Sequence, residues 1–173
     1  MLKENSKEEF LQLIQENKGI IFRICNSYCR NKNDREDLAQ EIIYQLWKSG
    51  QSFDNEHRFS TWMYRVALNV AISFYRKEKS SNAFMPLTDN LAELSDKNET
   101  NEGMEEKINL LQQFINELKE LDKALMILHL DARSYSEIAE VLGITETNVA
   151  TKLSRIKDKL KEKFNQKLLT TNN

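Results

Sequence analysis

Residues 147–155 are rich in side chains that can form hydrogen bonds with nucleic-acid bases or phosphates. Four of these residues are Asn148, Thr151, Lys152 and Arg155. Amides, hydroxyls and cationic groups of this kind recognise base edges in the major groove of DNA. The surrounding segment 143–167 has seven basic and three acidic residues, a balance of +4. This pattern favours DNA binding, and the alternative is a plain helical hairpin with a solvated basic face.

A second stretch, "FSTWMYRVALNVAISFYRK" at 59–77, combines aromatic rings with cationic and amide side chains. The polar members are Arg65, Asn69, Arg76 and Lys77. Rings on which bases stack, next to cations that follow phosphates, are typical of sites for unpaired DNA. Apolar residues recur on nearly every side of this segment. It is therefore a helix that is either fully buried or shared by two interfaces, and each aromatic taken alone favours core packing.

Groups that support catalysis or metal binding are sparse. The chain has two cysteines, Cys25 and Cys29, and two histidines, His57 and His129. A structural zinc site needs four nitrogen or sulfur ligands close together, and the cysteines have no histidine nearby. No phosphate-binding glycine loop or nucleophile motif is present. We therefore expect no catalytic residue, no metal, no cofactor and no enzymatic activity.

The elements that position the first stretch form two short helices joined by a tight turn. Ser134 and Glu137 form a capping box for a helix over 135–142. Gly143 can end that helix in the left-handed conformation, and Thr145 can cap the next. The second helix has one apolar stripe, which consists of Val149, Leu153, Ile156, Leu160 and Phe164. The pattern predicts a helix-turn-helix whose second helix presents its polar side to DNA.

The whole chain is predicted to be all-α. One Pro and four Gly in 173 residues favour long helices over hairpins. Two small helical domains are expected, at 1–80 and 105–165, with a linker over 81–104 and a tail over 166–173. The linker region is acidic, since 87–106 has a balance of −6. With neither a membrane span nor an apolar secretory segment, the chain is expected in the cytoplasm, without membrane insertion.

A third motif, "DREDLAQEIIYQLW" at 34–47, completes the pattern. Together with "FSTWMYRVALNVAISFYRK" and "SYSEIAEVLGITETNVATKLSRIKDKL", it resembles the extracytoplasmic-function subfamily of bacterial sigma factors over residues 8–163. The resemblance implies a region 2-like first domain and a region 4-like second domain. The implied contacts with core RNA polymerase are made by Asp37, Leu38, Gln40 and Glu41. It also implies that Asn69 captures a flipped base of the −10 element.

The implied function is promoter-specific initiation by core RNA polymerase on promoter DNA, and an anti-sigma factor is a compatible further partner. Lys152 and Ala150 depart from the family pattern, which often has Arg and a basic residue at these positions. An atypical −35 preference is expected, because Lys is a poorer bidentate partner of guanine than Arg. Two alternatives stay open from the residues alone. One is a stand-alone helix-turn-helix regulator with a ligand-binding or dimerising first lobe, and the other is an adaptor for helical partners.

Overall fold

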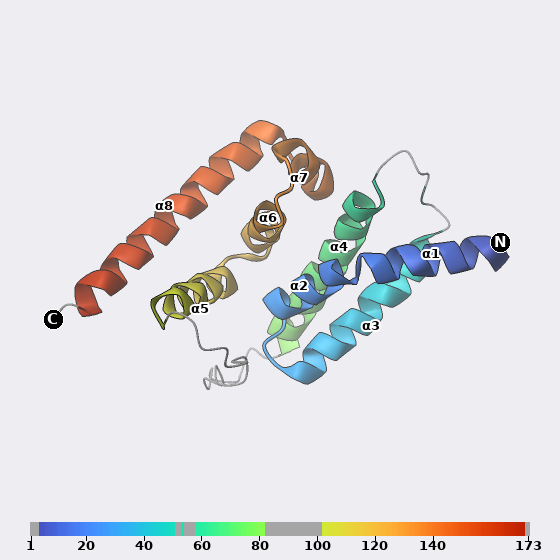
Figure 1. Cartoon of the computed structure of the whole chain (residues 1–173), viewed down its shortest axis with the longest axis horizontal. Helices are drawn as coiled ribbons and strands as arrows, with labels where there is room; N and C mark the ends of the chain where they lie inside the picture. The colour runs from blue at the N-terminus through green and yellow to red at the C-terminus, as the bar shows by residue number, and fades with distance from the viewer. Residues whose placement is uncertain (1–3, 51–52, 54–57, 82–101, 172–173) are drawn as a thin grey trace.

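The computed structural model describes residues 4–50, 53, 58–81 and 102–171, which form helices and no strand (Figure 1). The first four helices make one lobe, and the last four make a second lobe on the other side of the molecule. The bounds are α1 Glu4–Glu16, α2 Lys18–Tyr28, α3 Lys32–Ser49, α4 Phe59–Ser81, α5 Glu102–Glu117, α6 Glu120–Leu130, α7 Tyr135–Leu142 and α8 Glu146–Thr171. The all-α prediction is confirmed.

The first lobe is built around α4, which packs against α2 and α3. Helix α3 begins after Asn31, whose side chain accepts a hydrogen bond of 2.8 Å from the Asp34 backbone N–H. This contact satisfies one of the amides that a helix N-terminus leaves unpaired. Buried side chains spaced four residues apart on α3, namely Leu38, Ile42 and Leu46, complete the core of this lobe.

The second lobe contains the predicted helix-turn-helix in α7 and α8. The capping box is present, since the Ser134 hydroxyl accepts from the Glu137 amide and the Glu137 carboxylate accepts from the Ser134 amide. Gly143 ends α7 with φ of 66°, a left-handed conformation that glycine adopts without the steric cost of a Cβ. Thr145 accepts a bond of 3.2 Å from the Asn148 amide at the start of α8. All three predictions about the ends of these helices are therefore confirmed.

The two lobes pack directly on each other. Helix α4 of the first lobe contacts α7, and α2 contacts α5 and α6. The Tyr28 hydroxyl donates a hydrogen bond of 2.8 Å to the backbone carbonyl of Glu120 across the contact. Buried side chains of both lobes form one continuous hydrophobic cluster. The sequence predicts two domains but contains no signal for this contact.

Three helix ends differ from the predicted domain limits. Helix α4 continues to Ser81, and α5 begins at Glu102, inside the predicted linker. Helix α8 continues to Thr171, through most of the predicted tail, because Leu160 and Phe164 extend its apolar stripe toward α5. The remaining predicted linker, 82–101, lies outside the described residues.

Gly50 and Gly103 provide a test of core packing. A Cβ on Gly50 would lie 2.5 Å from Cζ of Phe10, whereas a Cβ on Gly103 would meet nothing within 4 Å. Gly50 has φ of −59°, so its backbone conformation suits alanine and the penalty is steric alone. We expect Gly50→Ala to lower the free energy of unfolding by about 1–3 kcal/mol. Gly103→Ala, in an exposed helix, should raise it by about 0.5–1 kcal/mol.

Urea unfolding followed by circular dichroism measures both changes. A Gly50→Ala protein as stable as the wild type would show that the Phe10 ring moves aside without cost.

Candidate nucleic-acid and protein interfaces

The outer side of α8 carries three of the four predicted −35 contacts. Asn148, Thr151 and Arg155 are exposed, while Val149 and Leu153 on the other side are buried. The Thr151 hydroxyl donates a bond of 2.9 Å to the backbone carbonyl of Thr147, which orients its oxygen as an acceptor. The helix-turn-helix therefore presents an amide, a hydroxyl and a guanidinium on one accessible side of its second helix.

Lys152 lies elsewhere than the sequence predicts. Its side chain is half-buried on the flank of α8 that faces α6, and its Nζ lies 3.6 Å from Oδ1 of Asp122. Four residues before Ile156 and one before Leu153, it borders the buried stripe and does not share the outer side. The ion pair occupies this lysine within its own lobe.

Helix α4 presents a polar stripe to solvent. Arg65, Asn69 and Arg76 are exposed at spacings of four and seven residues, which places them on one side of the helix. Ser73 is also exposed on this side. The sequence does not single it out, because a serine is uncharged and common on exposed helix surfaces. Lys77 is exposed next to Arg76. Nε of Arg76 lies 3.8 Å from Oε1 of Glu120 in the second lobe.

The rest of α4 is enclosed by two different neighbours. Tyr64 and Leu68 are fully buried, on the side that meets the second lobe and α2. At the N-terminal end of the helix, on the side of the polar stripe, Trp62 lies in an aromatic cluster whose ring centroids are 5.3–6.2 Å apart. The cluster consists of Phe10, Trp47, Phe53, Phe59 and Trp62. The prediction that this helix serves two interfaces is confirmed, and these rings pack in the protein.

On α3 the structure separates the four predicted polymerase contacts. Asp37, Gln40 and Glu41 are exposed, but Leu38 is fully buried in the lobe. Leu38 therefore presents no exposed side chain to a partner in this structure. Its spacing of four from Ile42 places it on the inner side of the helix, where it fills the core.

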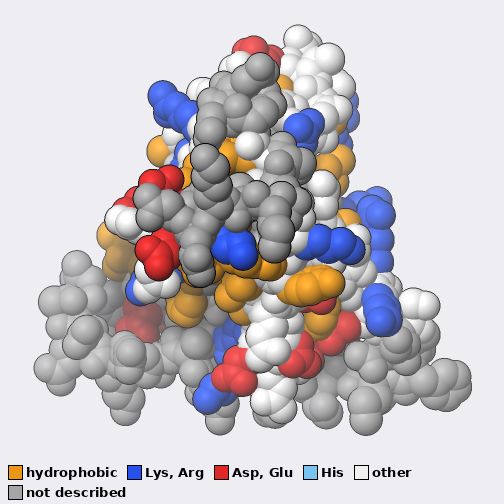
Figure 2. All heavy atoms as spheres, turned by 90° about the vertical axis from the view of Figure 1, so that its right-hand side faces the viewer, with side chains coloured by type: hydrophobic (Ala, Val, Ile, Leu, Met, Phe, Trp, Pro, Cys, Tyr) orange, Lys and Arg blue, Asp and Glu red, His pale blue; other side chains and the backbone are white. Residues whose placement is uncertain are grey.

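Three apolar residues of α3 are exposed, and none of them is among the contacts predicted from the sequence. They are Ile43, Tyr44 and Trp47, with exposed fractions of 45%, 56% and 41%. Exposed aliphatic and aromatic groups beside carboxylates are typical of a protein-binding surface. Figure 2 shows the side of the first lobe on which hydrophobic side chains gather between charged ones. Apolar residues occur on both the buried and the exposed side of α3, so the sequence alone does not show which of them are exposed.

The cysteines are unsuited to metal binding or redox chemistry. Both are buried, and burial raises the thiol pKa of Cys25 to about 11 and that of Cys29 to about 12. Thiols with such pKa values stay protonated at neutral pH and are poor ligands. No metal-binding group of His, Cys, Asp and Glu occurs among the described residues. His57 lies outside the described residues.

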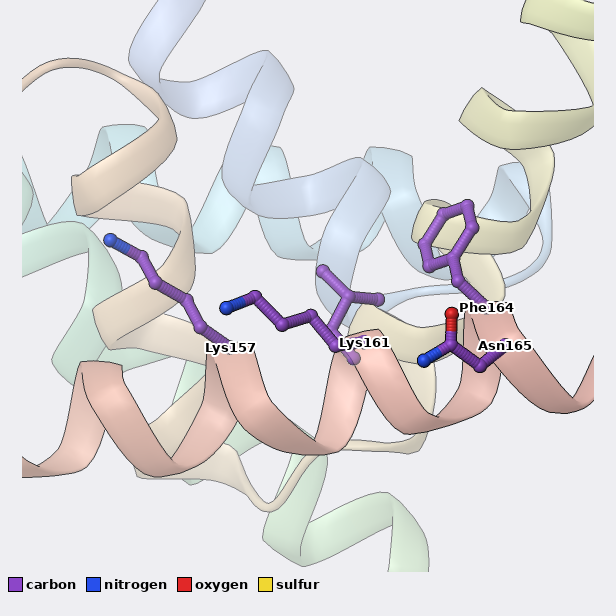
Figure 3. A pocket seen from close by; sticks show the side chains of 5 residues that line it. Lys157, Lys161, Phe164 and Asn165 are labelled. Atoms are coloured by element: carbon purple, nitrogen blue, oxygen red, sulfur yellow. The ribbon is translucent and has the colours of Figure 1, made fainter.

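A shallow hollow lies along the second half of α8. It is lined by Lys157, Leu160, Lys161, Phe164 and Asn165, all from this one helix (Figure 3). The site lacks the enclosing walls and converging polar groups of a small-molecule pocket. None of its lining residues belongs to the first lobe. The alternative of a stand-alone regulator requires a ligand site in that lobe. No helix in the described part of the chain is long and apolar enough to cross a membrane.

Comparison with known proteins matches both lobes to regions of the same protein family. Sigma-70 region 2 matches residues 13–81, and Sigma-70 region 4 matches residues 108–160. The two matches contain α4 with its polar stripe and the helix-turn-helix with its exposed polar side. The chain belongs to the sigma-70 family. Within it, the chain is a member of the extracytoplasmic-function subfamily, as its relatives show.

The ECF RNA polymerase sigma factor SigW of Bacillus subtilis is 28% identical, and the match covers 94% of this chain and 92% of SigW. RNA polymerase sigma factor SigV of the same organism is 28% identical, over 88% of this chain and 89% of SigV. The sigma factor RpoE of Bartonella quintana, solved with the anti-sigma factor NepR, has the same fold. Its TM-score is 0.66 at 18% identity, over 94% of this chain and 98% of RpoE. This sigma factor therefore directs transcription initiation.

Proposed function

We propose that this sigma factor binds core RNA polymerase and the two promoter elements through three exposed helix sides. The outer side of α3 binds core RNA polymerase, the polar stripe of α4 binds the −10 element, and the outer side of α8 binds the −35 element. One observation carries the proposal, which is that the two polar, accessible helix sides belong to separate lobes within one chain. A stand-alone regulator needs only the second lobe for DNA and leaves the stripe of α4 without a ligand.

The docking side of α3 combines charge with apolar area. Asp37, Gln40 and Glu41 supply polar groups, Tyr44 supplies an exposed ring, and Trp47 supplies the exposed part of a ring that also contacts Phe10. Carboxylates at the edge of such a patch steer a basic partner into position, and burial of the rings stabilises the complex. The partner surface that fits is a basic helix with apolar side chains.

The stripe of α4 suits a DNA strand that has left the duplex. Arg65 and Arg76 can contact phosphates, and Asn69 between them can form hydrogen bonds with a base edge. Trp62 precedes Asn69 by two turns on the same side, and the aromatic cluster fixes its ring. A rigid helix with these groups can hold an extruded base, which offsets part of the cost of unstacking it.

Two finer properties belong to the same proposal. The chain has no enzymatic activity of its own, because the polymerase performs the phosphoryl transfer, and it acts in the cytoplasm, where the polymerase and promoters are. An anti-sigma factor is a fitting partner, since RpoE and CnrH were both solved with proteins that bind them, NepR and CnrY.

Sequencing of RNA 5′ ends, made by core polymerase on genomic DNA with and without the chain, tests the function. Discrete start sites that require the chain support it, and their absence contradicts it.

Glu41→Lys tests the docking side of α3. Glu41 is exposed, so the reversal should leave the free energy of unfolding within about 0.5 kcal/mol of the wild type. It should weaken binding to core polymerase roughly tenfold, because like charges then meet at the interface. Surface plasmon resonance with immobilised core polymerase measures the loss. Glu16→Lys on α1 is the matched reversal and should bind normally, so equal affinities for all three proteins would place the docking side elsewhere.

Arg155→Ala and Lys152→Ala test the −35 contacts against each other. Loss of Arg155 should cost about 1–3 kcal/mol in promoter-specific initiation. Lys152→Ala should cost less than about 1 kcal/mol, because this lysine is half-buried and already paired with Asp122. Initiation rates on promoters with altered −35 bases measure both. If Lys152→Ala proves the more damaging, the ion pair opens when DNA binds and the outer side is misassigned.

Asn69→Ala tests promoter melting. It should leave polymerase binding and −35 recognition intact but slow open-complex formation on duplex promoters, by roughly 1–3 kcal/mol in transition-state free energy. A premelted bubble should rescue much of the defect, because its −10 base is already extruded. Potassium permanganate footprinting on both templates makes the comparison, with Asn165→Ala on α8 as a control. Normal opening of the duplex by Asn69→Ala would leave Asn69 without a role in base capture.

A further inference from the structure

The outermost line of α8 is made of hydroxyl groups. Thr147, Thr151 and Ser154 are all exposed, and their spacings of four and three residues align them along the helix. Asn148 precedes Thr151 by three residues and Arg155 follows it by four, so both neighbour it on the accessible side. Arg155 is the one positive charge among the exposed residues 147, 148, 151, 154, 155 and 158. The surface offered to the major groove therefore consists mainly of uncharged groups.

Thr151 lies in the middle of this line, and its hydroxyl is already used as a donor. The hydroxyl oxygen lies 2.9 Å from the backbone carbonyl oxygen of Thr147, which can only accept. The single hydroxyl hydrogen is therefore bound within the helix, whereas the lone pairs of the oxygen stay available. To a ligand outside the helix, the Thr151 side chain offers an acceptor and a methyl group.

An acceptor next to a methyl group distinguishes between the base pairs. Guanine presents only acceptors in the major groove, N7 and O6, so a hydroxyl that can only accept gains nothing from it. Adenine and cytosine both present an amino group, but only the A·T pair adds a methyl group, on thymine, for apolar contact. An A·T pair therefore satisfies both parts of the Thr151 side chain.

The two sequence neighbours of Thr151 also favour A·T pairs. Lys152 could donate to guanine, but it is half-buried and its Nζ lies 3.6 Å from Oδ1 of Asp122. Ala150 is exposed and has only a methyl group, which can contact the methyl group of thymine in the major groove. Neither neighbour presents a donor to guanine.

The place of the selected pair follows from the order of the side chains along α8. At about 1.5 Å per residue, Thr151 lies about 4.5 Å from Asn148 and about 6 Å from Arg155 along the helix axis. In the major groove, an amide pairs with adenine and a guanidinium pairs with guanine. The A·T pair is therefore expected between the adenine that Asn148 contacts and the guanine that Arg155 contacts.

We propose that Thr151 is a specificity-determining residue, which selects an A·T pair at the centre of the −35 element by accepting a hydrogen bond from adenine and contacting the methyl group of thymine. This proposal rests on the assignment of the outer side of α8 to the −35 element. It adds which base pair that side selects and which groups make the selection. Cytosine at the same place would engage the hydroxyl alone.

Selection from a promoter library locates the pair. Holoenzyme made from core polymerase and the full chain transcribes templates with a randomised −35 region, upstream of a start site that requires the chain. The wild type should enrich A·T about fivefold to tenfold at one central pair. Thr151→Ala should lose this preference and keep the preferences at the flanking pairs. An unchanged profile in Thr151→Ala, or a G·C or C·G preference at the pair that it relaxes, would overturn the proposal.

Two base analogues and two further variants separate the methyl group from the hydroxyl. Thr151→Val keeps the shape without the hydroxyl, and Thr151→Ser keeps the hydroxyl without the methyl group. Deoxyuridine in place of the thymine removes one methyl group and should weaken binding of wild-type holoenzyme about threefold to fourfold. Deoxynebularine in place of the adenine removes the amino group and should weaken it about threefold to tenfold. Circular dichroism establishes that each variant is folded.

Each variant should lose its sensitivity to one analogue, because the group that senses the change is missing. Thr151→Ser should bind the thymine and deoxyuridine templates equally, and Thr151→Val should bind the adenine and deoxynebularine templates equally. Deoxynebularine at the adenine next to Asn148 is the control and should weaken binding of both variants. Equal penalties at the central pair for the wild type and both variants would overturn the proposal. Absence of every start site that requires the chain would instead contradict the proposed function itself.

Discussion

Helix α4 meets three environments, which are the neighbouring helices, the aromatic cluster and solvent. Its packing against helices of both lobes determines which of its residues form the exposed stripe. Met63, Tyr64 and Leu68 are enclosed by the neighbouring helices, Trp62 at the N-terminal end of the helix belongs to the aromatic cluster, and the stripe with Asn69 faces solvent. A helix held in this way cannot rotate to bury its exposed stripe. Because close packing resists small rotations, the Cα–Cβ bond of Asn69 keeps a fixed direction.

The contact between the lobes combines the continuous hydrophobic cluster with charged and hydroxyl groups, among them Tyr64, Asp131 and Lys123. Burial raises the pKa of Tyr64 to about 12, so its hydroxyl stays protonated and donates to Asp131 at neutral pH. Burial lowers the pKa of Lys123 to about 8, which records the cost of enclosing the ammonium group. Contacts in which desolvation cancels much of the attraction are weak for their buried area. Interfaces between domains that move are commonly of this polar kind.

Sequence predicted local features well and relations between helices poorly. The capping box at Ser134, the left-handed Gly143 and the Thr145 cap depend on residues within four positions of each other, and all three are present. Leu38 and Lys152 were misplaced because the inner and outer sides of a helix depend on which neighbour covers it. The docking role of Leu38 was implied by the resemblance to sigma factors, whereas its spacing with Ile42 and Leu46 places it on the buried side.

Contacts between the lobes were beyond such an analysis. Tyr64 and Asp131 are 67 positions apart, and no periodicity relates them. A buried tyrosine on an apolar helix and an aspartate in a turn are each ordinary by themselves. Their pairing follows only once α4 and α7 lie together. Asn69, Arg65 and Arg76 were predictable because their chemistry and spacing on one helix suffice to group them.

Three charged groups at the contact between the lobes also have partners within their own lobes. Asp131 pairs with Arg133 at 3.2 Å, and Lys123 donates to the backbone carbonyl of Asn116 at 3.3 Å. In the first lobe, Arg23 donates to the Tyr64 hydroxyl at 3.5 Å. A buried charge that loses its sole partner destabilises a protein strongly. Here Asp131, Lys123 and Arg23 each have a partner in their own lobe, so none of these charges depends on the other lobe alone.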